Sequence, residues 1–160
     1  MIKQAVIDSN ILVALVDKQD KWHVRAQAIF TSLEIEAISI IYFDCVLNET
    51  ISVLGRRVEE QKRPEQFPML LDELLRRVSI DKITWVSPEI RRLYLDIIEL
   101  IRQHSGVLNF HDALIALICR ESGINTIISF DQDFSRITWL KTIKQTDDVK
   151  TAFPIAEEET

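Results

Sequence analysis

The sequence predicts an α/β protein, a three-layer α/β/α sandwich around a mainly parallel central sheet. Short apolar runs of strand length alternate along the chain with longer segments of helical periodicity. Such alternation is typical of units in which helices cover both faces of a parallel sheet. The 160 residues include only 3 Gly and 4 Pro, which argues against long linkers.

The expected strands are short apolar runs bounded by polar residues. They are residues 3–8, 36–41, 82–87 and 124–130, with 140–145 as a further candidate. The expected helices repeat apolar residues every three or four positions and span residues 9–17, 20–34, 43–60, 67–78, 88–101 and 111–123. Ser9 or Asn10 is available to cap the first helix, Pro88 suits a first turn, and Gly123 suits a C-terminal cap.

Composition bounds the class of protein. A chain of 160 residues most simply forms one domain. Its last residues, "AEEET", are acidic. Cys45 and Cys119 lie in apolar contexts, which favours free thiols in a reducing compartment. We find no signal-peptide core and no apolar run of the ~18 residues that a membrane span needs, so we expect a cytoplasmic protein.

Acidic residues follow two of the predicted strands and begin one buried helix. Asp8 ends the first strand, Asp131 and Asp133 follow the fourth, and Asp112 opens the segment "DALIALIC". Each has a simple structural explanation: a turn, a helix cap or an Asx turn. The helix dipole should also favour the ionised form of Asp112.

Glu49 is harder to explain by structure alone. It borders the apolar side of its helix, and its neighbours at i+3 and i+4 are Ser52 and Val53, which offer no ion pair. A partner elsewhere in the fold or a cation is needed if the group is buried, unless Arg56, two turns away on the same side of the helix, pairs with it.

Taken together, these acids indicate a metal site. The carboxyl ends of parallel strands meet at one edge of the sheet, where α/β proteins bind ligands. Two carboxylates about 4 Å apart repel by roughly 4 kcal/mol at an effective dielectric constant of ~20, so several need protons or a cation. Oxygen ligands without Cys or His suit Mg²⁺ or Mn²⁺ and favour phosphoryl chemistry.

The segments "AVIDSNILVAL", "VLNETISVL" and "FHDALIALICRESGINTIISFDQDF", in this order, resemble the PIN-domain family of metal-dependent ribonucleases, including VapC-type toxins. The resemblance implies endonucleolytic cleavage of RNA by an activated water with Mg²⁺ or Mn²⁺. We expect one PIN-like domain over residues 1–150, followed by the acidic tail at 151–160. The four family acids match Asp8, Glu49, Asp112 and Asp131, of which we expect Asp8, Asp112 and Asp131 to bind the metal. Asn10, Ser129 and Asp133 match positions that support the cluster.

The resemblance also implies partners: an RNA substrate, a possible antitoxin protein and a second copy of the chain. A net charge of −6 opposes RNA binding unless basic residues gather locally. Of the basic residues in "GRRVEEQKR" we favour Arg56 as a phosphate contact, which predicts a flatter salt dependence of RNA binding when Arg56 becomes Ala. Trp22, Trp85 and Trp139 are expected to pack in the interior and not to stack on bases, and His111 is not expected to be catalytic.

Two other functions stay open. A phosphatase of the haloacid-dehalogenase type needs a second Asp two residues after the first, and Asn10 stands there. A catalytically silent PIN-fold module that binds RNA or protein is the second alternative. The presence of all four acids argues against it.

Overall fold

The central sheet has five parallel strands in the order β3-β2-β1-β4-β5. We describe residues 2–155 of a computed structural model. The strands are β1 (Gln4–Ile7), β2 (Ser39–Phe43), β3 (Ile83–Thr84), β4 (Thr126–Ile128) and β5 (Lys141–Ile143). In β1, Val6 pairs with Ile41 of β2 on one side and with Ile127 of β4 on the other.

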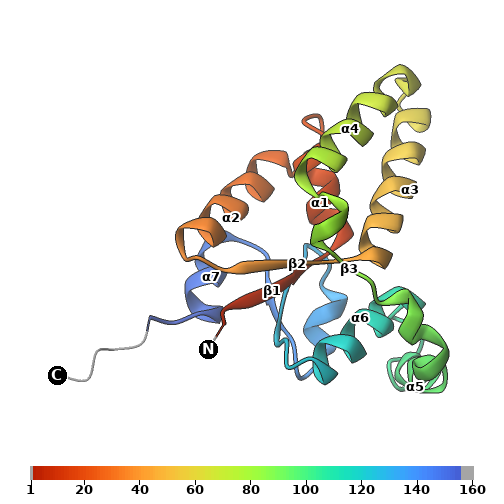
Figure 1. Cartoon of the computed structure of the whole chain (residues 1–160), viewed down its shortest axis with the longest axis vertical. Helices are drawn as coiled ribbons and strands as arrows, with labels where there is room; N and C mark the ends of the chain where they lie inside the picture. Colours follow the sequence, from red (N-terminus) through yellow and green to blue (C-terminus); the bar gives the residue numbers. More distant parts are fainter. Residues whose placement is uncertain (1, 156–160) are drawn as a thin grey trace.

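Helices cover both faces of this sheet, as the sequence predicts (Figure 1). They are α1 (Ser9–Val16), α2 (His23–Ile35), α3 (Asp44–Glu60), α4 (Phe67–Arg77), α5 (Ile90–Gln103), α6 (Phe110–Glu121) and α7 (Thr146–Ala152). Helices α1 to α4 lie on one side and α5 and α6 on the other, while α7 packs against β5 and α2. The three-layer α/β/α fold is therefore confirmed.

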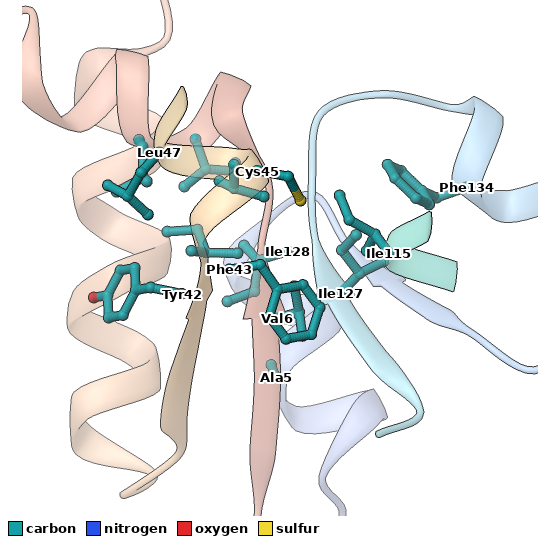
Figure 2. Close-up of a cluster of buried hydrophobic side chains, with 14 of the residues drawn as sticks. Ala5, Val6, Tyr42, Phe43, Cys45, Leu47, Ile115, Ile127, Ile128 and Phe134 are labelled. Atoms are coloured by element: carbon teal, nitrogen blue, oxygen red, sulfur yellow. The ribbon is translucent and has the colours of Figure 1, made fainter. Parts of the chain in front are cut away.

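The core is built from uninterrupted apolar strands. Ala5, Val6 and Ile7 of β1 are all fully buried, because a central strand of a parallel sheet meets helices on both faces. Figure 2 shows Val6 and Ile127 of the neighbouring strands close to Ile115 of α6. Helix α6 is buried at every position from Asp112 to Cys119, as its lack of a polar face predicts.

Several local predictions need correction. The strand expected at 82–87 is only Ile83–Thr84, and Trp85 beyond it is 58% exposed and not an interior residue. Pro88 lies in a short 3₁₀ segment, Ser87–Glu89, that precedes α5. The cap of α1 is Asp8, which is neither Ser9 nor Asn10: its carboxylate accepts from the Ser9 N–H. The strand β3 is short because it lies at the edge of the sheet and has only β2 to pair with.

Other local predictions are confirmed. Gly123 follows the end of α6 with φ +69°, the left-handed conformation that glycine adopts without strain. Cys45 and Cys119 are buried free thiols. None of the helices within residues 2–155 is long and apolar enough to cross a membrane. Helix α7 runs past the start of the predicted acidic tail, of which residues 156–160 lie outside the described part of the chain.

The strand order has one consequence for function. From β1 the chain adds β2 and then β3 on one side, and later adds β4 and β5 on the other. Strand order therefore reverses between β1 and β4, and the loops that follow these two strands diverge there. Ligand sites of open parallel sheets lie at this point, outside the carboxyl ends of the strands.

Candidate metal-binding active site

Asp8 lies at the reversal point, directly after β1, and is 4% exposed. Its Oδ1 accepts a hydrogen bond from the Ser9 N–H at 2.8 Å. Its Oδ2 accepts from Ser129 Oγ at 2.5 Å and from Asn10 Nδ2 at 3.2 Å. These three donors hold the carboxylate in one orientation.

Asn10 and Ser129 also connect the loops that follow β1 and β4. Asn10 Nδ2 donates to Ser129 Oγ at 3.2 Å, and Asn10 Oδ1 accepts from the Phe130 N–H at 3.1 Å. Ser129 Oγ in turn accepts from the Asp131 N–H at 3.0 Å. Both residues therefore fix the position of Asp131 relative to Asp8.

Asp112 reaches the same place from the start of α6. It belongs to a capping box: the Asp112 N–H donates to Asn109 Oδ1 at 2.8 Å, and Asp112 Oδ2 accepts from the Asn109 N–H at 3.1 Å. The capping explanation is thus correct, but it occupies only one carboxylate oxygen. The other oxygen has no hydrogen-bond partner among the described residues.

Glu49 comes from α3 and is half-buried. Within residues 2–155 it makes no hydrogen bond and no ion pair, and Arg56 pairs with Glu60 at 4.0 Å and does not contact it. Glu49 thus carries a charge that no side chain of the described part neutralises.

The four acids share one cavity of about 180 Å³. Its walls come from α1, α3, the start of α6 and the loop after β4, and they carry Asp8, Ser9, Asn10, Val13, Glu49, Val53, Arg57, Asn109, Asp112 and Asp131. Asp133 is absent from this lining; its N–H donates to Asp131 Oδ1 at 2.8 Å, which is the expected Asx turn. His111 does not line the cavity either.

Burial and mutual repulsion disfavour the charged forms of two acids. Burial raises the pKa of Asp8 from 3.8 to about 6, against the hydrogen bonds from Ser129 and Ser9, and the charges of Glu49 and Asp131 raise it too. Burial likewise raises the pKa of Asp112 to about 7, with further contributions from the charges of Asp8, Asp131 and Glu49. The Asn109 N–H lowers the pKa of Asp112, but burial and the neighbouring charges outweigh it.

The chemistry of the lining fits a hard divalent cation. The atoms of its lining that could bind a metal are oxygen atoms, since neither Cys nor His is among the residues that line it. Within residues 2–155 no group of three or more His, Cys, Asp or Glu side chains is arranged to hold a metal directly. Mg²⁺ usually keeps several waters and uses one or two carboxylates, so an ion held partly through water suits this arrangement.

Arg57 is the cavity residue that the sequence analysis missed. It lines the cavity and forms an ion pair with Asp20, whose side chain is 3% exposed. Arg56, the predicted phosphate contact, has a side chain 65% exposed and is absent from the lining. The spacing Glu49, Val53, Arg57 places three residues on one stripe of α3 and could have identified Arg57.

A family model described as "PIN domain" matches residues 5–140. The chain belongs to the PIN-domain family. The match covers Asp8, Glu49, Asp112 and Asp131, and with them every strand of the sheet except the last. No curated protein matches this PIN-domain chain.

Solved structures share the PIN-domain fold. Mycobacterium tuberculosis VapC20, a sarcin–ricin loop cleaving toxin, is 21% identical, with a TM-score of 0.63 over 84% of this chain and 95% of that one. VapBC2 from Rickettsia felis, bound to a DNA fragment from their promoter, is 22% identical, with a TM-score of 0.61 over 89% of this chain and 98% of that one. PAE2754 from Pyrobaculum aerophilum is 18% identical, with a TM-score of 0.60 over 95% of this chain and 98% of that one.

Proposed function

We propose that this PIN-domain protein is an Mg²⁺- or Mn²⁺-dependent endoribonuclease that cleaves RNA phosphodiester bonds by an activated water. The observation that carries the proposal is the convergence of Asp8, Glu49, Asp112 and Asp131 on one cavity at the reversal point of the sheet. Burial, and after it the charges of the neighbouring acids, raises the pKa values of Asp8 and Asp112. A divalent cation is the counter-charge that lets all of them stay ionised at neutral pH.

We assign roles from the hydrogen bonds of each side chain. Asp8, Asp112 and Asp131 would hold the cation partly through water, and Glu49 would complete its surroundings or orient the attacking water. Asn10 and Ser129 position Asp8 and Asp131. When bound, the metal would lower the pKa of a coordinated water and stabilise charge on the phosphate.

Arg57 gives this acidic cavity one positive charge on its wall. We propose that it contacts the RNA phosphate next to the scissile bond. Its ion pair with the buried Asp20 limits the side chain to a few conformations, so the guanidinium is already placed when substrate arrives. Arg56, which is exposed and does not line the cavity, stays a predicted phosphate contact.

The test is cleavage of a labelled RNA with Mg²⁺, Mn²⁺ or EDTA. We expect cleavage with either metal, none in EDTA, and none with metal for Asp8→Asn or Asp112→Asn. Asp96→Asn is the matched control, since Asp96 is exposed on α5 and does not line the cavity. Full activity of Asp8→Asn would overturn the assignment, and an inactive wild-type chain that still binds RNA would support a silent binding module.

We also propose that the chain is the toxin of a toxin–antitoxin pair, acts in the cytoplasm and pairs as a homodimer. The likeness of its fold to VapC20 and VapBC2 supports the first part. A short reading frame beside the gene, encoding a DNA-binding N-terminus, would supply the antitoxin. Growth arrest on expression of the wild-type chain but not of Asp112→Asn tests toxicity, and light scattering of the purified chain tests the dimer.

A further inference from the structure

Trp22 is not an interior residue, contrary to the sequence prediction: it is 39% exposed. It lies at the start of α2, and its ring centroid is 5.6 Å from that of Phe130. Arg25 Cζ lies 5.2 Å from the Trp22 centroid and 5.4 Å from that of Phe130, and Lys21 Nζ lies 5.2 Å from Trp22. We call Lys21, Trp22, Arg25 and Phe130 the Trp22 cluster.

The Trp22 cluster is joined to the acidic cavity on two sides. The Phe130 N–H donates to Asn10 Oδ1, and Phe130 directly precedes Asp131. The Trp22 N–H donates to Asp20 Oδ1 at 2.7 Å, and the other oxygen of Asp20 pairs with Arg57 on the cavity wall. The cluster therefore flanks the cavity at a fixed position.

The two cations of the cluster are free to meet an anion. Neither Lys21 nor Arg25 forms an ion pair within residues 2–155, although the chain carries more acidic than basic residues. Arg25 Nε donates to the Lys144 carbonyl at 2.9 Å, which orients the guanidinium over both rings without neutralising it. By contrast, Arg92 pairs with both Glu89 and Glu121.

We propose that the Trp22 cluster binds an unpaired RNA base next to the scissile phosphate. The base would stack on the Trp22 ring, and Arg25 and Lys21 would contact the phosphates on either side of it. The inference rests on the proposed function, which makes RNA the ligand.

Unpaired bases are recognised by stacking on aromatic rings and guanidinium planes, and exposed Trp and Arg side by side supply both. Stacking of a base on an aromatic side chain is generally stronger than an exposed cation–π contact, so the base can displace the Lys21 ammonium from the ring. Double-stranded RNA keeps its bases stacked inside the helix. The cluster therefore selects single-stranded segments.

The test is the anisotropy of a labelled eight-nucleotide RNA with Mg²⁺, on chains that carry Asp112→Asn to prevent cleavage. In this background we expect Trp22→Leu to weaken RNA binding about tenfold. Trp22→Phe keeps a ring, so its RNA affinity should stay within about threefold of that of the Asp112→Asn chain. Trp85→Leu is the matched control, because Trp85 is more exposed and belongs to neither the cluster nor the cavity lining. Annealing the RNA to its complement should remove the difference between Trp22→Leu and this control.

A second variant separates stacking from charge. Arg25→Gln should reduce the slope of log affinity against log salt by about 0.7, the value for one phosphate contact on a single strand. Thermal unfolding of each variant shows whether it is folded. Equal binding by the Trp22→Leu and Trp85→Leu variants would overturn the proposal, as would a Trp22→Phe variant that is folded but binds as weakly as Trp22→Leu.

The outcomes also separate this inference from the proposed nuclease. Metal-dependent cleavage by the wild-type chain, together with unchanged RNA binding by Trp22→Leu, would remove the stacking site and leave the nuclease. Absence of cleavage, together with weaker RNA binding by Trp22→Leu, would leave a single-strand binding site on a protein that is not a nuclease.

Discussion

Ser129 Oγ donates to Asp8 Oδ2 across 2.5 Å, between residues 121 positions apart in the chain. The same oxygen accepts from the Asp131 N–H, so one fully buried hydroxyl holds two of the four acids. A supporting role for Ser129 is predicted from the sequence. These two hydrogen bonds are the contacts through which a single small side chain would fill it.

Removing this hydroxyl should impair cleavage without removing an acid. We expect Ser129→Ala to lower metal affinity or cleavage about 10- to 100-fold, the usual effect of losing a group that orients a metal ligand. Ser129→Thr keeps the hydroxyl and should retain most activity. Cleavage rates measured over a Mg²⁺ titration check this, and wild-type rates for Ser129→Ala would show that the hydrogen bond is dispensable.

Asp112→Asn should stabilise the metal-free protein while it abolishes cleavage. The amide oxygen can still accept from the Asn109 N–H, so the capping box survives, but repulsion from Asp8, Asp131 and Glu49 is relieved. We expect a gain on the order of 1 kcal/mol in the free energy of unfolding at pH 7.5. Urea unfolding in EDTA measures it.

The control for that gain is another acid in a capping box. Asp148 has the same role at the start of α7 and does not line the cavity. Asp148→Asn should bring no gain in stability. A gain of equal size in both variants would mean that charge at helix starts, and not the acid cluster, is responsible.

The stability of the metal-free protein should depend on pH through Asp8 and Asp112. Their folded pKa values of about 6 and about 7 exceed the usual 3.8, so between about pH 4 and pH 7 the folded state binds more protons than the unfolded chain. The contribution of these groups to the free energy of unfolding therefore falls as pH rises through this window. Calorimetry in EDTA should show that the wild-type protein gains stability from pH 8 to pH 5.5 relative to the Asp8→Asn, Asp112→Asn double variant.

Added Mg²⁺ should remove most of this difference at pH 8. A cation that binds only the folded state stabilises it, and it supplies the counter-charge that protons supply at lower pH. The double variant should respond little to Mg²⁺. An equal rise of Tm with Mg²⁺ in both proteins would place the ion elsewhere.

Arg57 and Arg56 form a matched pair of adjacent residues on α3. Arg57→Gln leaves Asp20 buried without its charged partner, so we expect a loss of about 1–3 kcal/mol in stability, together with weaker RNA binding. Arg56→Gln should change stability by less than about 1 kcal/mol, because its pair with Glu60 is exposed. RNA affinity and urea unfolding of both variants test this, and unchanged RNA affinity for Arg57→Gln would exclude the contact.

Sequence reasoning succeeded where burial determines structure. The run at 111–123 predicts α6, because apolar residues on every side leave only an interior position. The run at 124–130 predicts a strand at the right place, although only Thr126–Ile128 form β4. At the edge of the sheet the same reasoning overestimated β3, whose sequence reads as a strand although only two residues pair.

Asp8, Asp112 and Asp131 could be located because strand ends and helix starts are local features of sequence, and Glu49 because it borders the apolar side of its helix. Their partners could not, because they depend on contacts between distant segments. Arg57 meets Asp20 across 37 positions. Likewise, Asp44 at the start of α3 accepts from the N–H groups of Val86 and Ser87, more than 40 positions away. The raised pKa of Asp112 also depends on neighbours that only the fold assembles.

The position of β4 between β1 and β5 has a consequence during synthesis. Ser129 and Asp131 emerge from the ribosome long after Asp8, and until β4 inserts beside β1 the Asp8 carboxylate has neither of them as a neighbour. The nuclease site that we propose would therefore stay incomplete while the chain is being made, until β4 has been synthesised and has inserted beside β1.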